Sequence, residues 1–166
     1  MLTNDTIDLL LSRRSVRAYK PDSISEEEMN SLLTAARYAP SAMGKQERFF
    51  SVVTDPKLLE EIGQAGGNQP FYNAPAAVIV SVPPENRFGQ HDAACALMNL
   101  MIAAHSMNID TCYIGSAVGA KAPEIMKKLG IPQGYEPAAA VAIGYGAQES
   151  AQPAPRREDD TFFVKG

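Results

Sequence analysis

The segment 76–82 constrains the fold more than any other part of the chain. It reads Ala-Ala-Val-Ile-Val-Ser-Val, an apolar run with a single polar residue. A half-buried strand alternates apolar and polar residues, whereas a nearly continuous apolar run of this length is typical of a strand covered on both faces. We therefore expect the chain to supply packing for both sides of a sheet.

Helices and further strands are predicted around this strand. Ser25-Glu26-Glu27-Glu28 has the pattern of a capping box and predicts the start of a helix that ends before Pro40. Asp55-Pro56 predicts a second helix with proline at its first position. The remaining short elements are strands over residues 49–53, 111–116 and 138–143 and a helix over 124–129. Helices and strands mixed around one sheet, in a single domain over residues 1–166, form an α+β architecture.

A longer helix is predicted from Asp92 to about Met107. Small and apolar residues occupy one side of it, and four apolar residues continue round the other side: Ala94, Met98, Met101 and Ile102. A helix that is apolar nearly all round is buried, and in so short a chain a partner subunit would help to bury it. We therefore expect a homodimer. The methionines of this region are expected to fill the core rather than to bind a ligand: Met98, Met101 and Met107.

The composition excludes several classes of function. The chain has 166 residues, a net charge of −4 and a pI near 5.2, which argues against a general nucleic-acid-binding protein. Cys95 and Cys112 lie far apart, and with only two histidines besides them we expect neither a disulfide framework nor a metal site. The longest apolar stretch, residues 74–82, is far too short to span a membrane, and the N-terminal run is too short for a signal sequence. A cytoplasmic protein with no membrane and no nucleic-acid partner is expected.

Four basic residues crowd into positions 13–20, just after a short apolar run that predicts one or two helical turns. They are Arg13, Arg14, Arg17 and Lys20. On an acidic chain such a cluster makes a concentrated positive field, which favours an anion. Guanidinium groups match phosphate oxygens, and Ser15 adds a hydroxyl donor between them. A solvated basic loop is the alternative, and the cluster alone does not decide between the two.

Three motifs, taken in order, resemble the nitroreductase family of FMN-dependent oxidoreductases. They are the arginine cluster, the sequence Ala39-Pro40-Ser41-Ala42-Met43-Gly44-Lys45-Gln46, and the sequence Cys112-Tyr113-Ile114-Gly115-Ser116. The similarity runs from the N-terminal helix to Pro155-Arg156 and so covers nearly the whole chain. It implies a nitroreductase-like fold, with a mixed, mainly antiparallel sheet flanked by helices, and a homodimer with flavin sites at its interface. It also implies a C-terminal arm over residues 147–166.

By this resemblance, one end of the cofactor FMN would be bound by the arginine cluster, through Arg13, Arg14, Ser15 and Arg17. Arg13 and Ser15 would engage the phosphate and the ribityl chain, and Arg17 would lie near the pyrimidine edge of the ring. A fixed cation at that edge favours the negatively charged reduced flavin and so raises its reduction potential. The alternative for Arg17 is a surface ion pair with one of three glutamates, Glu26, Glu27 or Glu28.

The other two motifs would complete the flavin site. The resemblance assigns five residues of the Ala-Pro-Ser loop to the flavin of the partner subunit: Pro40, Ser41, Ala42, Gly44 and Gln46. The family commonly has Asn where this chain has Gly44, so an amide contact to the ring is expected to be lost or replaced. Ile114 and Gly115 would offer backbone N–H groups to N5 and O4, because glycine lets backbone approach a flat ring closely. The alternatives are a helix stop followed by a turn, and a plain strand-ending turn.

The resemblance also assigns a residue of the arm to the flavin. Arg156 would return to the phosphate, with Arg157 as its substitute if the register shifts by one. The alternative is a solvated basic pair facing the acidic residues 158–160. No side chain is assigned a catalytic role, because the flavin carries the electron chemistry.

The implied activity is that of an enzyme in which NADH or NADPH reduces FMN and then leaves. An oxidising small molecule takes its place, which gives ping-pong kinetics, and nitroaromatics, quinones and free flavins are the implied acceptors. The short chain lacks long insertions, which predicts an open pocket. A flavin-binding module without turnover, for storage, sensing or electron relay, is the alternative. A Rossmann dinucleotide enzyme fits worse, because no G-x-G-x-x-G sequence follows a predicted strand.

Overall fold

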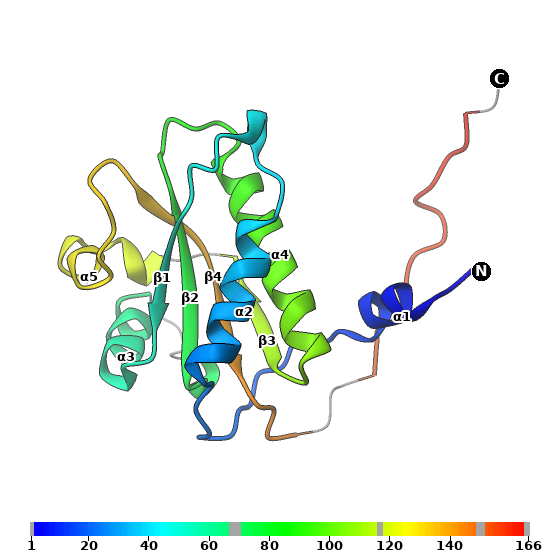
Figure 1. The fold of residues 1–166 in the computed structure, drawn as a ribbon, viewed down its shortest axis with the longest axis horizontal. Helices are drawn as coiled ribbons and strands as arrows, with labels where there is room; N and C mark the ends of the chain where they lie inside the picture. Colours follow the sequence, from blue (N-terminus) through cyan, green and yellow to red (C-terminus); the bar gives the residue numbers. More distant parts are fainter. Residues whose placement is uncertain (1, 67–70, 116–117, 149–151, 165–166) are drawn as a thin grey trace.

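A four-stranded antiparallel sheet organises the chain in the computed structural model, which describes residues 2–66, 71–115, 118–148 and 152–164 (Figure 1). The strand order is β1-β2-β4-β3, so β2 and β4 are the inner strands. The strands are β1 (Phe49–Val53), β2 (Ala76–Val82), β3 (Asp110–Ile114) and β4 (Glu136–Gly144). All three strand pairs are antiparallel, which agrees with the mainly antiparallel sheet that the resemblance implies. An isolated parallel bridge between Ser15 and Thr111 places the N-terminal segment beside β3.

Two of the helices, α2 and α3, begin where local sequence signals place them. They are α1 (Asp5–Ser12), α2 (Glu26–Arg37), α3 (Pro56–Ala65), α4 (Gly89–Ser106) and α5 (Pro123–Lys128), with 3-10 turns η1 (Ala42–Gly44), η2 (Phe71–Asn73) and η3 (Val118–Lys121). The predicted capping box of α2 is present: the Ser25 hydroxyl accepts from the Glu28 N–H at 3.2 Å, and the Glu28 carboxylate accepts from the Ser25 N–H at 2.8 Å. Pro56 occupies the first turn of α3, as expected.

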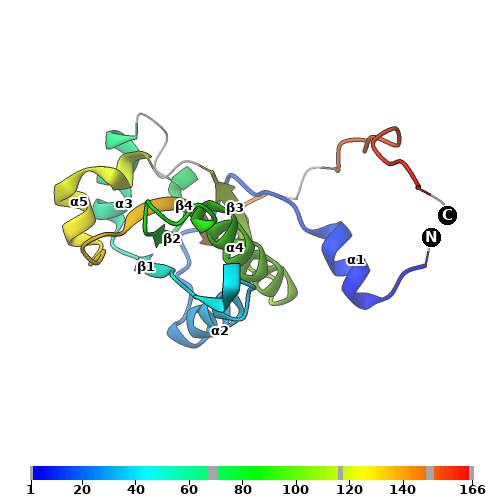
Figure 2. The ribbon, with the colours of Figure 1, turned by 90° about the horizontal axis from the view of Figure 1, so that it is seen from above.

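Both faces of β2 are covered, as its apolar run predicts. Every residue of the strand is buried. Val78 and Val80 pack with α2 and α4 in one cluster, whereas Ala77 and Ile79 pack with α3, η3 and α5 in another. Figure 2 shows these two helical layers on either side of the sheet. The predicted α+β architecture is confirmed.

Several element boundaries differ from the prediction: β4 extends beyond the predicted 138–143 at both ends, and α5 lies one residue before the predicted 124–129. α4 begins at Gly89 rather than at Asp92, because Asn86 makes a turn just before it. The Asn86 side chain accepts from the Phe88 N–H at 3.0 Å, and its carbonyl accepts from the Gly89 N–H at 2.8 Å. The strand predicted over 111–116 runs from Asp110 to Ile114. Ser116, at the end of that prediction, lies outside the described residues.

One prediction about the helix α4 is wrong. Met98 does not fill the core, because it is 41% exposed, whereas Met101 is buried and Met107 packs at the edge of the core. The sheet and α2 cover only the side of α4 that carries its fully buried residues: Ala93, Ala96, Leu97, Leu100 and Ala104. Met98 and the exposed Cys95 lie on the remaining side. This side of α4 is open in the single chain.

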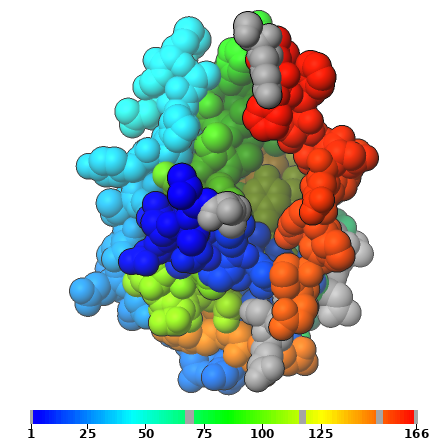
Figure 3. Space-filling model, turned by 90° about the vertical axis from the view of Figure 1, so that its right-hand side faces the viewer, coloured from blue at the N-terminus to red at the C-terminus, as the bar shows by residue number. Residues whose placement is uncertain are grey.

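The helix α1 and the C-terminal arm (residues 147–166) project from the body of the molecule (Figures 1 and 2). α1 has no buried residue, and its Leu11 is 54% exposed. The arm is exposed over residues 152–164, including Phe162 and Phe163. Figure 3 shows the surface hollowed between α1 and the arm, with residues of α4 in the hollow. Apolar side chains thus gather on the projecting parts without cover from this chain.

Candidate functional site

The arginine segment (residues 13–20) runs as extended chain beside the edge strand β3. The Val16 N–H donates to the Thr111 carbonyl at 3.0 Å, and the Lys20 N–H donates to the Tyr145 carbonyl at 2.8 Å. The bridge of Ser15 with Thr111 lies in the same stretch. These are backbone contacts, so they fix the path of the segment whatever side chains it carries. The side chains of Ser15 and Arg17 are left exposed to the outside.

The two adjacent arginines of this segment do different things. Arg14 is half-buried, and its guanidinium donates to the carbonyls of Leu11 at 2.7 Å and of Arg13 at 2.8 Å. It therefore closes the C-terminal end of α1, where carbonyls lack intrahelical partners. The Arg13 N–H donates to the Leu9 carbonyl at 3.3 Å, and the positive charge of its half-buried side chain acts to lower the pKa of the Cys112 thiol in β3. Arg14 is thus engaged with backbone carbonyls of its own segment, whereas the charge of Arg13 is felt at the sheet.

Arg17 lies against Tyr72, a residue that the sequence analysis did not single out. The Cζ atom of Arg17 is 6.0 Å from the centroid of the Tyr72 ring. The Tyr72 hydroxyl raises the pKa of Arg17 most, and the nearby Cys112 thiol raises it further. Within the described ranges, no carboxylate lies within ion-pair distance of Arg17. The alternative of a surface ion pair with the α2 glutamates is not realised.

Buried side chains pack beside the arginine segment. Cys112 is 2% exposed, and burial raises the pKa of its thiol, against the opposing influence of Arg17 and Arg13. Burial also raises the pKa of Tyr19, whose hydroxyl donates to the Val16 carbonyl at 2.7 Å. Cations that stand over a low-dielectric surface exert a stronger field on a bound anion than cations surrounded by water. The charge and the surroundings of the segment therefore favour an anion.

Ile114 and Gly115 lie at the end of β3, on the same edge of the sheet as the arginine segment. Ile114 is half-buried and Gly115 is exposed. A Cβ atom added at Gly115 would meet only the Tyr113 ring, at 3.4 Å, which is an ordinary contact. Packing within the chain therefore does not require glycine at this position. What glycine provides here is bare backbone that a flat group can approach from outside.

The Ala-Pro-Ser loop (residues 40–46) folds into a tight turn around η1. The Ser41 hydroxyl accepts from the Gln46 N–H at 3.0 Å, and Met43, Gly44 and Gln46 all have positive φ. A hollow of about 490 Å³ is lined by Arg37, Tyr38, Ala39, Pro40, Ser41, Gly44 and Gln46. Four of the five residues assigned to the flavin in this loop line the hollow. The fifth residue, Ala42, does not line the hollow, and its backbone N–H donates to a side chain of α4.

That side chain is Asp92, whose role the sequence analysis missed. Asp92 is 5% exposed, and its Oδ1 atom accepts from the Ala42 N–H at 3.0 Å. Its Oδ2 atom has no hydrogen-bond partner among the described residues. A carboxylate in the first turn of α4 suits the helix dipole, but a contact with a residue fifty positions away leaves no local pattern in the sequence.

The arginine segment and the Ala-Pro-Ser loop lie at opposite ends of α4. The loop contacts Asp92 in the first turn of α4, and the residue before the segment, Ser12, contacts His105 in the last turn, with Oγ and Nε2 2.8 Å apart. At about 1.5 Å of rise per residue, these two ends of the helix are about 20 Å apart. A single copy of the chain therefore does not bring the Ala-Pro-Ser loop to the arginine segment.

The arm leaves the body beside the arginine segment, where the Ala147 N–H donates to the Ala18 carbonyl at 2.9 Å. Farther along, Arg157 pairs with Asp159 at 3.0 Å, whereas among the described residues the Arg156 guanidinium donates only to the Ala154 carbonyl, at 3.2 Å. The ion pair thus takes up Arg157 and leaves Arg156 as the more available cation of the two.

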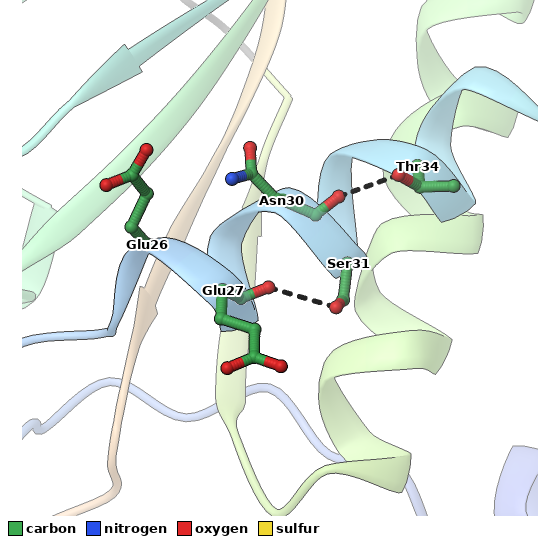
Figure 4. A pocket seen from close by; sticks show the side chains of 5 residues that line it. All are labelled: Glu26, Glu27, Asn30, Ser31 and Thr34. Atoms are coloured by element: carbon green, nitrogen blue, oxygen red, sulfur yellow. Dashed lines mark hydrogen bonds between the residues drawn. The ribbon is translucent and has the colours of Figure 1, made fainter.

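A larger hollow on the outer face of α2 is unsuited to an anion (Figure 4). It measures about 760 Å³ and is lined by Glu26, Glu27, Asn30, Ser31 and Thr34. The hydroxyls of Ser31 and Thr34 donate to carbonyls of their own helix, at 3.0 and 2.8 Å. The two carboxylates would repel a phosphate, even though the Asn30 amide could donate a hydrogen bond, so the size of a hollow alone does not identify the site.

In the described ranges no three His, Cys, Asp or Glu side chains gather closely enough to hold a metal ion. No helix among the described residues is both long and apolar enough to cross a membrane.

Comparison with known proteins identifies the family. A sequence model of the nitroreductase family matches residues 10–83 and 63–145. A protein of Archaeoglobus fulgidus, named as a candidate NADH dehydrogenase/NAD(P)H nitroreductase, is 29% identical over 152 residues, 87% of each chain. An FMN reductase (NADPH) of Bacillus subtilis is 27% identical over 172 residues, which cover 90% of this chain and 69% of the relative.

A solved structure agrees with this match. The crystal structure of a Bacteroides fragilis nitroreductase with bound FMN superimposes with a TM-score of 0.86 and 28% identity, over 99% of this chain and 100% of the other. The fold predicted from the three motifs is therefore confirmed as nitroreductase-like. Because the family match spans most of the chain and the fold agrees, the chain belongs to the nitroreductase family.

Proposed function

We propose that this chain is an FMN-dependent NAD(P)H oxidoreductase. The observation that carries the proposal is the arginine segment, held by backbone hydrogen bonds beside the end of β3. Its donors suit FMN, because a phosphate needs cations and hydroxyls and a flavin ring needs bare backbone within reach. Relatives named as an FMN reductase and as an FMN-bound nitroreductase support the same cofactor.

Each residue of the segment would have its own part in binding. Arg13 and Ser15 would hold the phosphate and the ribityl chain, and Arg17 would stand at the pyrimidine edge of the ring. Arg14 would act indirectly, because its guanidinium is engaged with the carbonyls of Leu11 and Arg13. The backbone N–H groups of Ile114 and Gly115 would donate to N5 and O4.

The active form would be a homodimer, since one copy holds the two halves of the site at opposite ends of α4. Residues 40–46 of one subunit would meet the flavin bound by the arginine segment of the other. The exposed leucines of α1 and the open side of α4 support such a partner, because apolar surface of this kind is normally covered. Arg156 would reach the phosphate from the arm, and residues 1–166 would form one domain.

When bound, FMN would accept hydride from NADH or NADPH and pass the electrons to an acceptor. The chain would contribute binding, a positive field at the pyrimidine edge and backbone donors at the opposite edge. Nicotinamide and acceptor would use the same open site in turn, which gives ping-pong kinetics. The acceptors proposed are nitroaromatics, quinones and flavins.

Anaerobic spectroscopy of the purified protein with FMN tests this function. We expect the bound flavin to lose its visible absorbance on addition of NADH or NADPH, and to recover it on addition of menadione or nitrofurazone. Double-reciprocal plots at several acceptor concentrations should be parallel. A bound flavin that neither nicotinamide reduces would instead support a module for storage, sensing or electron relay. A protein that binds no FMN would overturn the proposal altogether.

A further inference from the structure

The short turn η2 carries three consecutive residues in the left-handed region. The φ angles are 42° at Phe71, 56° at Tyr72 and 60° at Asn73. None of the three is glycine, and L-residues visit this region rarely and singly. Backbone held in such a conformation persists only where the surrounding structure over-determines it, and such places are often functional.

The buried neighbours of the turn explain how it is held. Phe71 is 6% exposed and packs in the cluster beneath α3 and α5, and its carbonyl accepts from the Ala74 N–H at 3.0 Å. Tyr72 is half-buried against the same cluster, whereas Asn73 is exposed. The buried Phe71 side chain thus fixes the turn to the core, and the Tyr72 side chain lies at the surface next to Arg17.

At that surface the side chain of Tyr72 meets the guanidinium of Arg17. The Arg17 Cζ atom lies 6.0 Å from the ring centroid, a distance at which a cation is attracted to an aromatic face. The Tyr72 hydroxyl also raises the pKa of Arg17. An exposed arginine otherwise samples many rotamers, and ordering it costs conformational entropy when a ligand binds.

We propose that Tyr72 is a positioning residue that holds the Arg17 guanidinium where a bound flavin would develop negative charge. This inference rests on the proposed function, in which Arg17 stands at the pyrimidine edge of FMN. A cation that is already oriented stabilises the reduced, negatively charged ring more than the neutral oxidised ring. Loss of Tyr72 would therefore weaken the binding of reduced FMN more than the binding of oxidised FMN.

The test compares Tyr72→Leu and Tyr72→Phe with a matched control, Asn73→Ala, which alters the same turn at its exposed residue. For each variant, the dissociation constant of oxidised FMN and the midpoint potential of the bound flavin are measured. For Tyr72→Leu we expect the preference for reduced over oxidised FMN to fall about tenfold, which lowers the potential by about 30 mV. Tyr72→Phe keeps the ring and should show a smaller decrease, and Asn73→Ala should leave the potential unchanged.

The double variant Arg17→Met/Tyr72→Leu separates positioning from general disturbance of the fold. If Tyr72 acts through Arg17, adding Tyr72→Leu to Arg17→Met should produce no further change in potential. An unchanged potential in Tyr72→Leu would overturn this inference and leave the proposed function intact. So would a double variant whose potential falls below that of Arg17→Met by as much as Tyr72→Leu falls below the unaltered protein. Failure of the unaltered protein to bind FMN would overturn both.

Discussion

The arginine segment and the Ala-Pro-Ser loop belong to one proposed site, yet they are held to the body by different means. Residues 13–20 are held by backbone hydrogen bonds to β3 and to the chain after β4. Residues 40–46 are held by side chains: Asp92 accepts from Ala42, Ser41 accepts from Gln46, and Arg48 donates to the Ala39 carbonyl at 3.2 Å.

This difference decides what a substitution does in each region. An exposed side chain changed in the arginine segment, such as Ser15 or Arg17, alters the chemistry offered to a ligand and leaves the backbone path in place. Val16 and Tyr19 are exceptions, because their side chains belong to the core. A side chain removed from beneath the Ala-Pro-Ser loop releases the backbone itself. The first kind of change should therefore affect binding without affecting stability, and the second kind should affect stability first.

The strongest test of the comparison is Arg13→Ala. Removing one charge-assisted contact to the phosphate should weaken FMN binding by about 2 kcal/mol, or about thirtyfold. The melting temperature of the flavin-free protein should stay the same, because the backbone bond from Arg13 to Leu9 remains. Quenching of FMN fluorescence gives the affinity, and circular dichroism gives the melting temperature.

Lys20→Ala is the matched control, since it removes the same charge from the same segment at an exposed position without a proposed flavin contact. Its effect on FMN binding should be small and should vanish at high salt, where distant charges are screened. Equal losses in the two variants would mean that the segment acts only through its total charge.

Asp92→Ala tests the other side of the comparison. The buried carboxylate accepts from the Ala42 N–H and lies in the first turn of α4, so its removal should lower the free energy of unfolding by about 2 kcal/mol. Asp92→Asn keeps an oxygen that can accept from Ala42 and should lose less. Urea denaturation of the flavin-free protein measures both. Unchanged stability in Asp92→Ala would show that the loop does not depend on this side chain.

The fold could be predicted from the sequence wherever the signal was local. The capping box at Ser25, the proline at position 56 and the apolar run of β2 each specify their element within a few residues. Met98 was misassigned because apolar character marks a residue as suited to burial without saying which side of the helix the chain covers. A partner subunit would bury that side, and composition alone does not distinguish the two cases.

The candidate site was predictable only in part, for a similar reason. The arginine segment is a cluster in sequence and could be found as one. Tyr72 and Asp92 lie far along the chain from Arg17 and Ala42, and they join the site only when the strands pair and α4 packs. Contacts over such separations leave no periodic or spacing pattern, so they emerge only from the three-dimensional arrangement.

The smallest expected effect concerns Glu28, a side chain that supports the arginine segment from behind. It accepts from the Tyr145 hydroxyl at 2.8 Å, and the Tyr145 carbonyl accepts from the Lys20 N–H. The Ser25 hydroxyl, together with the Ser25 N–H and Tyr145, holds the pKa of Glu28 below its ordinary value of 4.5.

A carboxylate whose pKa is lowered by folding contributes stability above its unfolded pKa and loses it as the pH falls through the folded pKa. The stability advantage of the unaltered protein over Glu28→Gln should therefore shrink as the pH falls below about 4.5, as measured by urea denaturation. If the difference in unfolding free energy between the two proteins is the same at pH 7 and pH 3, Glu28 acts only through the geometry of its hydrogen bonds. Its negative charge would then make no contribution to the support of the arginine segment.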